Sequence, residues 1–314
     1  MIMTPKAGSS GLLITLLYFV HLQVSAGPLV SPGSFTVPFH LIAKLIIVEA
    51  TVDDHTGLFI LDTGTEELIL NAAHVNRPTG GRTIRDVGGH SAKLKTGYFS
   101  FSLGKINIKQ KRAFLADLRH LERNRNIHIL GLIGYSILED YEIVLDYTAK
   151  KLTFFELDRK GNRLTASSGQ REPSHIIPFK LKGHFPCFDI RIGGESFFVA
   201  LDTGAGLNVL DARVRERIAC SADGKRANIK GISRQQIQTV TLLMDGFQIE
   251  EVPYPSMLTI FKSLDRLNEF ITGRDIDGLL GYEFLHHYRT ALNYRKKELS
   301  VFGEEPVLAR LKKE

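Results

Sequence analysis

The chain has 314 residues, 43% of them hydrophobic and 24% charged, and a formal net charge of +6. This composition is sufficient for buried cores and excludes disordered, collagen-like and disulfide-scaffold proteins. The positive charge is spread thinly along the chain rather than gathered in a basic stripe with aromatic neighbours. We therefore expect no nucleic-acid partner.

Residues 1–26 are typical of a secretory signal peptide. Lys6 is their only Lys, Arg, Asp or Glu, residues 12–20 form an apolar stretch, and residues 24–26 are small enough for a cleavage site. The apolar stretch is too short to span a bilayer, and no later apolar run is long enough either. We expect a secreted or periplasmic protein with no stable membrane insertion after signal removal.

The only two cysteines are Cys187 and Cys220. The sequence leaves open whether they form a disulfide or remain two buried free thiols. It contains no CxxC, no HExxH and no local cluster of Cys and His. We therefore expect no metal and no cofactor.

The chain contains an internal duplication. An apolar run ending in Asp62-Thr63-Gly64 recurs as one ending in Asp202-Thr203-Gly204. A Pro-Phe pair precedes each motif at the same distance, and a Gly-apolar-apolar-Gly-Tyr segment follows it, at 131–135 and 278–282. From there, 134–155 aligns with 281–302 without a gap. We expect two similar lobes, 27–160 and 173–314, joined by a polar, turn-rich linker at 161–172.

Each half is predicted to be mainly β, because short runs rich in Val, Ile, Phe and Thr alternate with Gly, Asp and Asn. The pattern predicts a fold of two small β-barrel lobes with one or two helices each. The predicted strands are 45–52, 58–61, 98–103 and a hairpin of 141–145 with 152–155; the predicted helices are 135–140, its equivalent after Gly281, and 211–218.

An apolar strand that leads directly into Asp-Thr-Gly is suited to hold a reactive carboxylate. The strand fixes the backbone, the glycine permits a tight turn, and the threonine hydroxyl can bond to backbone across a symmetric interface. A single copy is equally consistent with an ordinary Asx turn. Two copies at matching places in duplicated lobes can meet about a pseudo-twofold axis, which brings Asp62 and Asp202 together.

On these motifs the sequence resembles the retropepsin-like branch of the aspartic proteases, as a single-chain pseudo-dimer. The resemblance is carried by residues 61–65, 201–205, 130–134 and 278–281. It implies two acid-protease β-barrel lobes in a monomer, no metal or cofactor, and a protein or peptide substrate bound as an extended strand. It also implies catalytic roles for Asp62 and Asp202, with loop support from Thr63, Gly64, Thr65, Thr203, Gly204 and Ala205.

The implied chemistry follows from electrostatics. Two adjacent carboxylates cannot both ionise cheaply, so they share one proton. The ionised one activates a water that attacks the peptide carbonyl, while the protonated one donates to the carbonyl oxygen. Because Thr65 offers a hydroxyl where the second motif has Ala205, we expect Asp62 to be ionised more often and Asp202 to be protonated more often.

Relatives in this family cover the two aspartates with flexible hairpins called flaps. The resemblance places these flaps at 86–90 and 228–232, and plain hairpin turns remain the alternative there. The candidate flap residues are Val87, Gly88, Gly89, Lys230 and Gly231.

Two other functions remain open. An aspartyl-phosphate enzyme is disfavoured because no lysine lies between the aspartate and the threonine and because β and α segments do not alternate. A catalytically inert peptide-binding module on a duplicated protease fold is disfavoured because both copies keep the aspartate, the threonine and the glycine.

Overall fold

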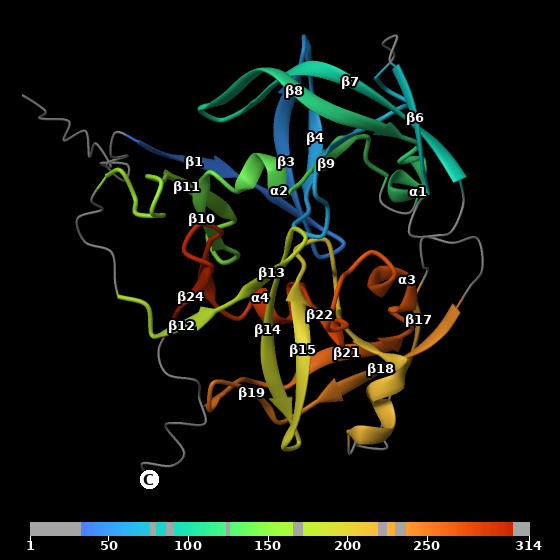
Figure 1. Cartoon of the computed structure of the whole chain (residues 1–314), viewed down its shortest axis with the longest axis vertical. Coiled ribbons are helices and arrows are strands. Elements are labelled where there is room, and N and C mark those ends of the chain that lie inside the picture. The colour runs from blue at the N-terminus through green and yellow to red at the C-terminus, as the bar shows by residue number, and fades with distance from the viewer. Residues whose placement is uncertain are drawn as a thin grey trace, which may run out of the picture.

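A computed structural model describes residues 33–75, 80–85, 91–123, 126–165, 172–218, 225–229 and 237–303. The fold is mainly β, as predicted. Two sheet lobes lie one above the other in Figure 1, and a third sheet at one side of the molecule takes strands from both halves of the chain. Among the described helices, none is both long and apolar enough to cross a membrane.

The first lobe is built on an eight-stranded sheet. Its strands are β2 (His40–Ile42), β3 (Leu45–Val52), β4 (His55–Leu61), β5 (Leu68–Asn71), β6 (Gly80–Arg85), β7 (Ser91–Leu103), β8 (Ile106–Ala116) and β9 (Ile129–Ile133). They lie in the order β2-β3-β4-β9-β5-β8-β7-β6. The single-turn helices α1 (Arg119–Glu122) and α2 (Tyr135–Leu138) precede and follow β9.

The second lobe repeats this topology. Its strands are β13 (Lys180–Lys182), β14 (Phe185–Ile192), β15 (Glu195–Leu201), β16 (Asn208–Asp211), β17 (Lys225–Ile229), β18 (Ile237–Met244), β19 (Phe247–Ile249), β20 (Val252–Pro253), β21 (Met257–Lys262) and β22 (Gly278–Leu280). The order β13-β14-β15-β22-β16-β21-β18-β17 matches that of the first lobe strand for strand, with β19 and β20 added beside β14. The strand that ends at Asp-Thr-Gly pairs in parallel with the Gly-apolar-apolar strand in both lobes, as β4 with β9 and β15 with β22.

The third sheet joins the two halves. It consists of β1 (Ser34–Pro38), β10 (Tyr141–Asp146), β11 (Lys151–Glu156), β12 (His175–Pro178), β23 (Arg289–Asn293) and β24 (Glu298–Phe302). The order β1-β11-β10-β23-β24-β12 is symmetric about the central antiparallel pair, β10 and β23. An approximate twofold axis therefore passes between these two strands (Figure 1).

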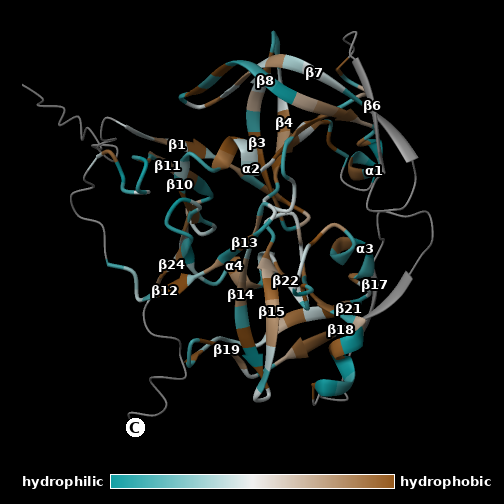
Figure 2. Ribbon diagram, in the orientation of Figure 1, coloured by the Kyte–Doolittle hydropathy of each residue, from teal (hydrophilic) through white to brown (hydrophobic). Residues whose placement is uncertain are grey.

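The apolar residues gather along the strands, where Figure 2 shows them as brown segments inside both lobes. In the third sheet, Phe154 is fully buried and stacks on Phe35, with ring centroids 4.9 Å apart and an interplanar angle of 3°. Tyr141 packs edge-on against the same Phe154 ring at 5.9 Å. Alternation along each strand sends these rings to one face of the sheet, where they form a core.

Several sequence predictions can be compared directly with these elements. The predicted strand 45–52 coincides with β3, and the predicted hairpin is β10 with β11. Strands β4 and β7 begin earlier than predicted, at His55 and Ser91. The helix predicted after Gly134 is a single turn, α2, and that predicted after Gly281 is α4 (Tyr282–Leu285).

The helix predicted at 211–218 is a 3-10 helix, η1 (Ala212–Arg217), which the Asp211 side chain caps. Two helices, α1 and α3 (Asp265–Asn268), were not predicted. Four residues are too few to show a helical period in a sequence.

The first residues of the predicted linker are tied back to the third sheet. Arg163 donates to Glu142 (Nε to Oε1, 2.8 Å), and Asn293 donates to the same carboxylate (Nδ2 to Oε2, 2.9 Å). Asn293 also donates to the carbonyl of Gly161 at 2.9 Å. A residue of the second half of the chain therefore holds the end of the first half in place.

Phe154→Ala tests how far the third sheet stabilises the fold. Removal of a fully buried ring should lower the free energy of unfolding by about 3–5 kcal/mol, measured by urea titration. Phe270→Ala is the matched control, because the Phe270 side chain is 58% exposed and its removal should change stability little. Equal effects of the two substitutions would contradict the packing described here.

Candidate active site

The two predicted aspartates lie directly after the equivalent strands β4 and β15. The backbone N–H of Asp62 donates to the carbonyl of Ile133 at 3.0 Å, and that of Asp202 donates to the carbonyl of Leu280 at 2.9 Å. Each aspartate is thereby fixed to the parallel neighbouring strand of its own lobe. Figure 1 shows the loops after β4 and β15 approaching each other where the lobes meet.

The two buried threonines tie these loops together by reciprocal hydrogen bonds. Each threonine N–H donates to the hydroxyl of the other threonine, Thr63 to Thr203 and the reverse, both at 3.0 Å. Each hydroxyl in turn donates to a strand-end carbonyl of the opposite lobe: Thr203 to Leu61 at 2.8 Å and Thr63 to Leu201 at 3.3 Å. Four bonds across the interface hold the two loops at a fixed separation.

The glycines of the two motifs allow each carboxyl group to approach the opposite loop. A Cβ atom on Gly64 would lie only 2.8–3.0 Å from the carboxyl atoms of Asp202, and one on Gly204 only 2.6–3.0 Å from those of Asp62. The N–H of each glycine donates to the Oδ1 of its own aspartate, at 2.9 Å for Gly64 and 2.8 Å for Gly204. The structure therefore places the two carboxyl groups face to face, each oriented by a backbone amide.

The two carboxyls differ in their hydrogen-bond partners. Burial raises the pKa of both, and they hydrogen-bond to each other. For Asp62 this rise is opposed by a hydrogen bond from the Thr65 hydroxyl to Oδ2 (3.1 Å) and by the Gly64 N–H. For Asp202, burial and then the negative charge of Asp62 raise the pKa to about 8. The bond from Thr65 favours the negative charge on Asp62 over Asp202, although the pair titrates as one unit.

The Gly-apolar-apolar-Gly segments support the loops from below. A Cβ atom on Gly134 would lie 2.4 Å from the carbonyl oxygen of Thr65, and one on Gly281 would lie 2.0 Å from that of Ala205. The next residue donates its N–H to the same carbonyl, Tyr135 to Thr65 at 2.9 Å and Tyr282 to Ala205 at 2.8 Å. Only glycine fits beneath each loop, which explains the repeated motif.

Two residues near the site were not singled out by the sequence analysis. His184, in the turn between β13 and β14, bonds through Nε2 to the carbonyl of Gly64 at 2.9 Å. Its counterpart in the first lobe, Lys44, instead pairs with Glu283 on α4 (Nζ to Oε1, 2.5 Å). Both residues stand at the same distance after their Pro-Phe pair, so alignment of the two repeats at this turn could have found them.

The flap candidates Val87, Gly88, Gly89, Lys230 and Gly231 lie outside the described residues. The strands on either side of them are described. β6 pairs antiparallel with β7 up to Arg85 and Ser91, and β17 pairs with β18 up to Ile229 and Ile237. Cys220 also lies outside the described residues, whereas Cys187 is a buried free thiol, and burial raises its pKa to about 12.

No family model matches the sequence, and no curated protein matches it. Among solved structures, the chain is similar to the aspartic proteinase from Irpex lacteus, with a TM-score of 0.52 and 15% sequence identity. The likeness covers 86% of this chain and 97% of that chain. The chain has the bilobal fold of an aspartic proteinase. At this identity the likeness shows the fold alone.

Thr203→Val tests the bonds between the loops. Valine has the shape of threonine without the hydroxyl, so the carbonyl of Leu61 and the N–H of Thr63 would both lose their partner in a buried place. Stability should fall by about 2 kcal/mol or more, measured by urea unfolding. Thr203→Ser, which keeps the hydroxyl, should retain most of the stability. Equal stability of the two variants would contradict the role given to these bonds.

Asp202→Asn should stabilise the protein as the pH rises. The folded state keeps the Asp202 proton up to about pH 8, while the unfolded chain releases it near pH 4, so folding binds a proton between these values. This group therefore lowers the stability of the wild-type protein progressively from pH 4 to pH 8. The variant should have a similar Tm at pH 4 and be more stable by at least about 1 kcal/mol at pH 7. Parallel Tm curves for variant and wild type would be evidence against the raised pKa.

Proposed function

We propose that this chain is an aspartic endopeptidase of the retropepsin-like type, with Asp62 and Asp202 as its catalytic pair. The observation that carries the proposal is the close approach of two buried carboxyls at the interface between the lobes. The carboxyls come from equivalent loops, and burial raises the pKa of both, while Asp62 alone accepts a further stabilising bond from the Thr65 hydroxyl. A strongly perturbed, coupled pair of carboxyls is typical of acid–base sites.

In the proposed reaction, a water molecule binds between the two carboxyls. Ionised Asp62 takes a proton from this water as the water oxygen attacks the carbonyl carbon of the peptide bond. Asp202 donates its proton to the carbonyl oxygen, which stabilises the tetrahedral intermediate. Collapse of the intermediate breaks the C–N bond. The proton gained by Asp62 passes to the leaving amine, and a hydroxyl of the intermediate returns a proton to Asp202 as the carbonyl double bond re-forms. The pair is thereby returned to its starting protonation.

The substrate in this proposal is an extended stretch of a protein or peptide. The hairpins β6–β7 and β17–β18 stand at equivalent edges of the two lobe sheets, where an extended chain can form backbone hydrogen bonds. In the sequence, the flap candidates lie between the two strands of each pair. Such backbone recognition supports a preference for extended chains of varied sequence.

The proposed form of the enzyme is a secreted or periplasmic monomer that has lost residues 1–26. One chain supplies both halves of the catalytic pair, so the proposed activity requires no second copy. The lobes are proposed to span 27–160 and 173–314, with the linker at 161–172. The third sheet, which takes β1, β10 and β11 from one half and β12, β23 and β24 from the other, agrees with this division.

A cleavage assay across pH 3–8 tests the function. The protein is incubated with a peptide library, and cut sites are mapped by mass spectrometry. Asp62→Asn and Asp202→Asn should each lower kcat/KM by at least about a thousandfold, because each removes one of the two proton-transfer groups. Asp189→Asn is the control, since that exposed aspartate pairs with Arg274 on the surface.

Two results would overturn the proposal. Cleavage by Asp202→Asn at the wild-type rate would place the chemistry elsewhere. Binding of a statine-type transition-state mimic by wild-type protein that cuts no peptide at any pH would instead identify an inert peptide-binding module.

A further inference from the structure

A second cluster of ionisable side chains lies on the first lobe, at the opposite end of β9 from the catalytic pair. His74 follows β5, Glu122 ends α1, and His128 directly precedes β9 at Ile129. The other end of β9 is Ile133, which holds Asp62. This cluster therefore has no part in the proposed cleavage.

The three side chains point toward one another. The Nε2 of His74 lies 2.6 Å from Oε1 of Glu122, and the Nδ1 of His128 lies 4.0 Å from the same oxygen. One ligand atom from each residue falls within 4.8 Å of the other two. The two imidazole rings meet edge to face, with centroids 5.4 Å apart.

The carboxylate of this cluster is held in place by the scaffold. Glu122 Oε1 accepts a hydrogen bond from the N–H of Ile129 at 2.8 Å and another from the side chain of Asn71 at 3.4 Å. Asn71 is itself fully buried and accepts from the N–H of Leu118 at 3.1 Å. Such support orients a ligand before a cation binds.

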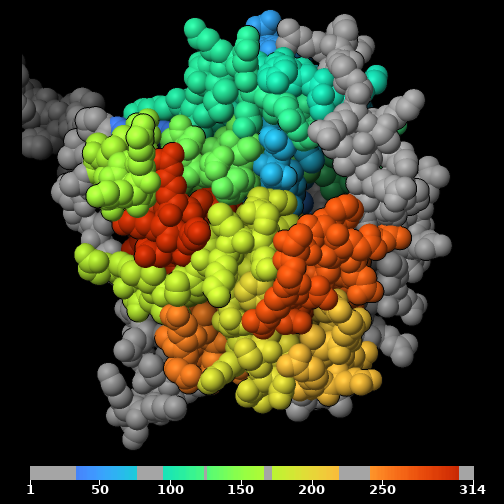
Figure 3. Space-filling model, viewed as in Figure 1, coloured from blue at the N-terminus to red at the C-terminus, as the bar shows by residue number. Residues whose placement is uncertain are grey.

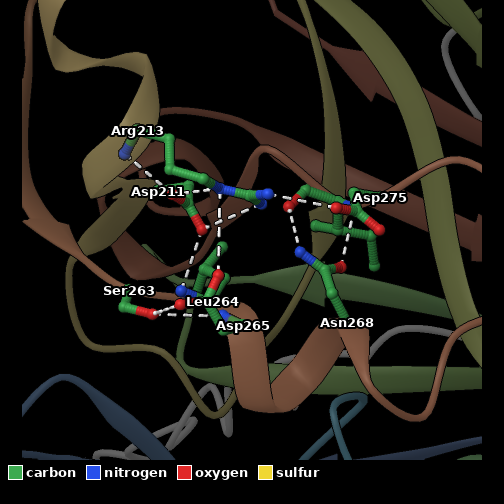
Figure 4. Close-up of polar contacts among 8 residues, drawn as sticks. Asp211, Arg213, Ser263, Leu264, Asp265, Asn268 and Asp275 are labelled. Carbon is green, nitrogen blue, oxygen red and sulfur yellow. Dashed lines mark hydrogen bonds and ion pairs between the residues drawn. The ribbon is translucent and has the colours of Figure 1, made fainter.

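The equivalent place in the second lobe shows which hydrogen bonds the fold itself requires (Figure 4). Asn268 occupies the position of Glu122, because its Oδ1 accepts from the N–H of Ile276 at 2.9 Å, just as Glu122 accepts from Ile129. Asp211 likewise accepts from Leu264, as Asn71 does from Leu118. A neutral amide is thus sufficient for the bond at the position of Glu122. The second lobe has its carboxylate at Asp211 instead, where it pairs with Arg213, whereas the carboxylate of Glu122 faces two histidines.

The histidines have no counterparts in the second lobe either. By the same register, Val214 stands in place of His74 and Asp275 in place of His128. In the second lobe the two loops are joined by an ion pair, from Arg213 to Asp275 at 3.2 Å. In the first lobe the same loops carry two imidazoles, which cannot form an ion pair with each other.

We propose that His74, Glu122 and His128 form a binding site for a divalent transition cation of the zinc type. The cation joins the loop after β5, helix α1 and the segment before β9, and so takes the place of the Arg213–Asp275 ion pair of the second lobe. Two imidazoles and one carboxylate are ligands that zinc prefers, and water completes the coordination.

The distances suit such a cation after small side-chain movements. Ligand atoms around a tetrahedral zinc lie about 3.3 Å apart, given bonds of about 2.0–2.1 Å. The pair at 2.6 Å must open and the pair at 4.0 Å must close by less than about 1 Å. His128, whose side chain is 92% exposed, is free to turn by this amount.

Calorimetric titration of the untagged protein with zinc chloride at pH 7.5 tests the site. The wild-type protein should bind one zinc ion, with a higher Tm when zinc is present. Glu122→Gln keeps a side-chain oxygen that can accept from the N–H of Ile129. His74→Val introduces the residue type that Val214 has at the equivalent position of the second lobe. Each of these, and His128→Ala, should raise the Kd at least tenfold. His120→Ala is the control, since His120 on α1 bonds to the carbonyl of Asp117, which precedes that helix.

The zinc affinities of these variants either support the site or overturn it. Zinc affinity lost in the three variants and kept in His120→Ala supports the site. Absence of stoichiometric binding to wild-type protein overturns it, as does unchanged affinity in Glu122→Gln, which would indicate adventitious binding by surface histidines. If His74→Val changes the Tm without zinc, His128→Ala still tests the site, because so exposed a side chain does not support the fold.

Discussion

The reciprocal bonds between Thr63 and Thr203 are the constraint on which the rest of the site depends. They cross the interface between lobes at the point where β4 and β15 end, and they use backbone and side chain of both residues. Because the threonines fix the separation of the loops, the glycine beside each can pack against the opposite carboxyl. The two carboxyls are then too close to ionise independently, and the shifted pKa values follow from this geometry. The third sheet also holds the two lobes together, because its central strands, β10 and β23, come from different halves of the chain and pair with each other.

A symmetric scaffold holds an asymmetric site. The backbone bonds of the two loops are nearly identical, yet Thr65 supplies a hydroxyl to Asp62 where the second loop has only Ala205. His184 adds to the difference, because it reaches the first loop at Gly64, while its counterpart Lys44 pairs with Glu283. Both differences favour charge on Asp62. Duplication within one chain permits this division of roles, whereas two identical copies would have to carry the same residues at both positions.

Much of this arrangement could be predicted from the sequence, because the residue patterns that determine it are local and occur once in each half of the chain. Short apolar runs between turn residues predicted the strands. The repeated Asp-Thr-Gly motif predicted the pair of aspartates, and the difference between Thr65 and Ala205 predicted that the two aspartates are not equivalent. Features that depend on tertiary contact were missed. The turns of α1 and α3 are too short to leave a period, and His184 reaches the site from a hairpin of the other lobe. His74 lies 48 residues from Glu122 in the sequence, so no search for adjacent ligands could have joined it to Glu122 and His128; we expected no metal for that reason.

The duplication also separates what the fold requires from what it does not. At positions that form the same bond in both lobes, such as the acceptors for the N–H of Ile129 and Ile276, the scaffold fixes the bond and leaves the residue type open. Asn268 shows that an amide is sufficient there; the second lobe has its carboxylate at Asp211, paired with Arg213, whereas the carboxylate of Glu122 faces His74 and His128. By the same comparison the threonines and glycines of the catalytic loops are required by geometry, because both copies keep them and both use them alike. Function is therefore best sought where the two lobes share a backbone and differ in charge.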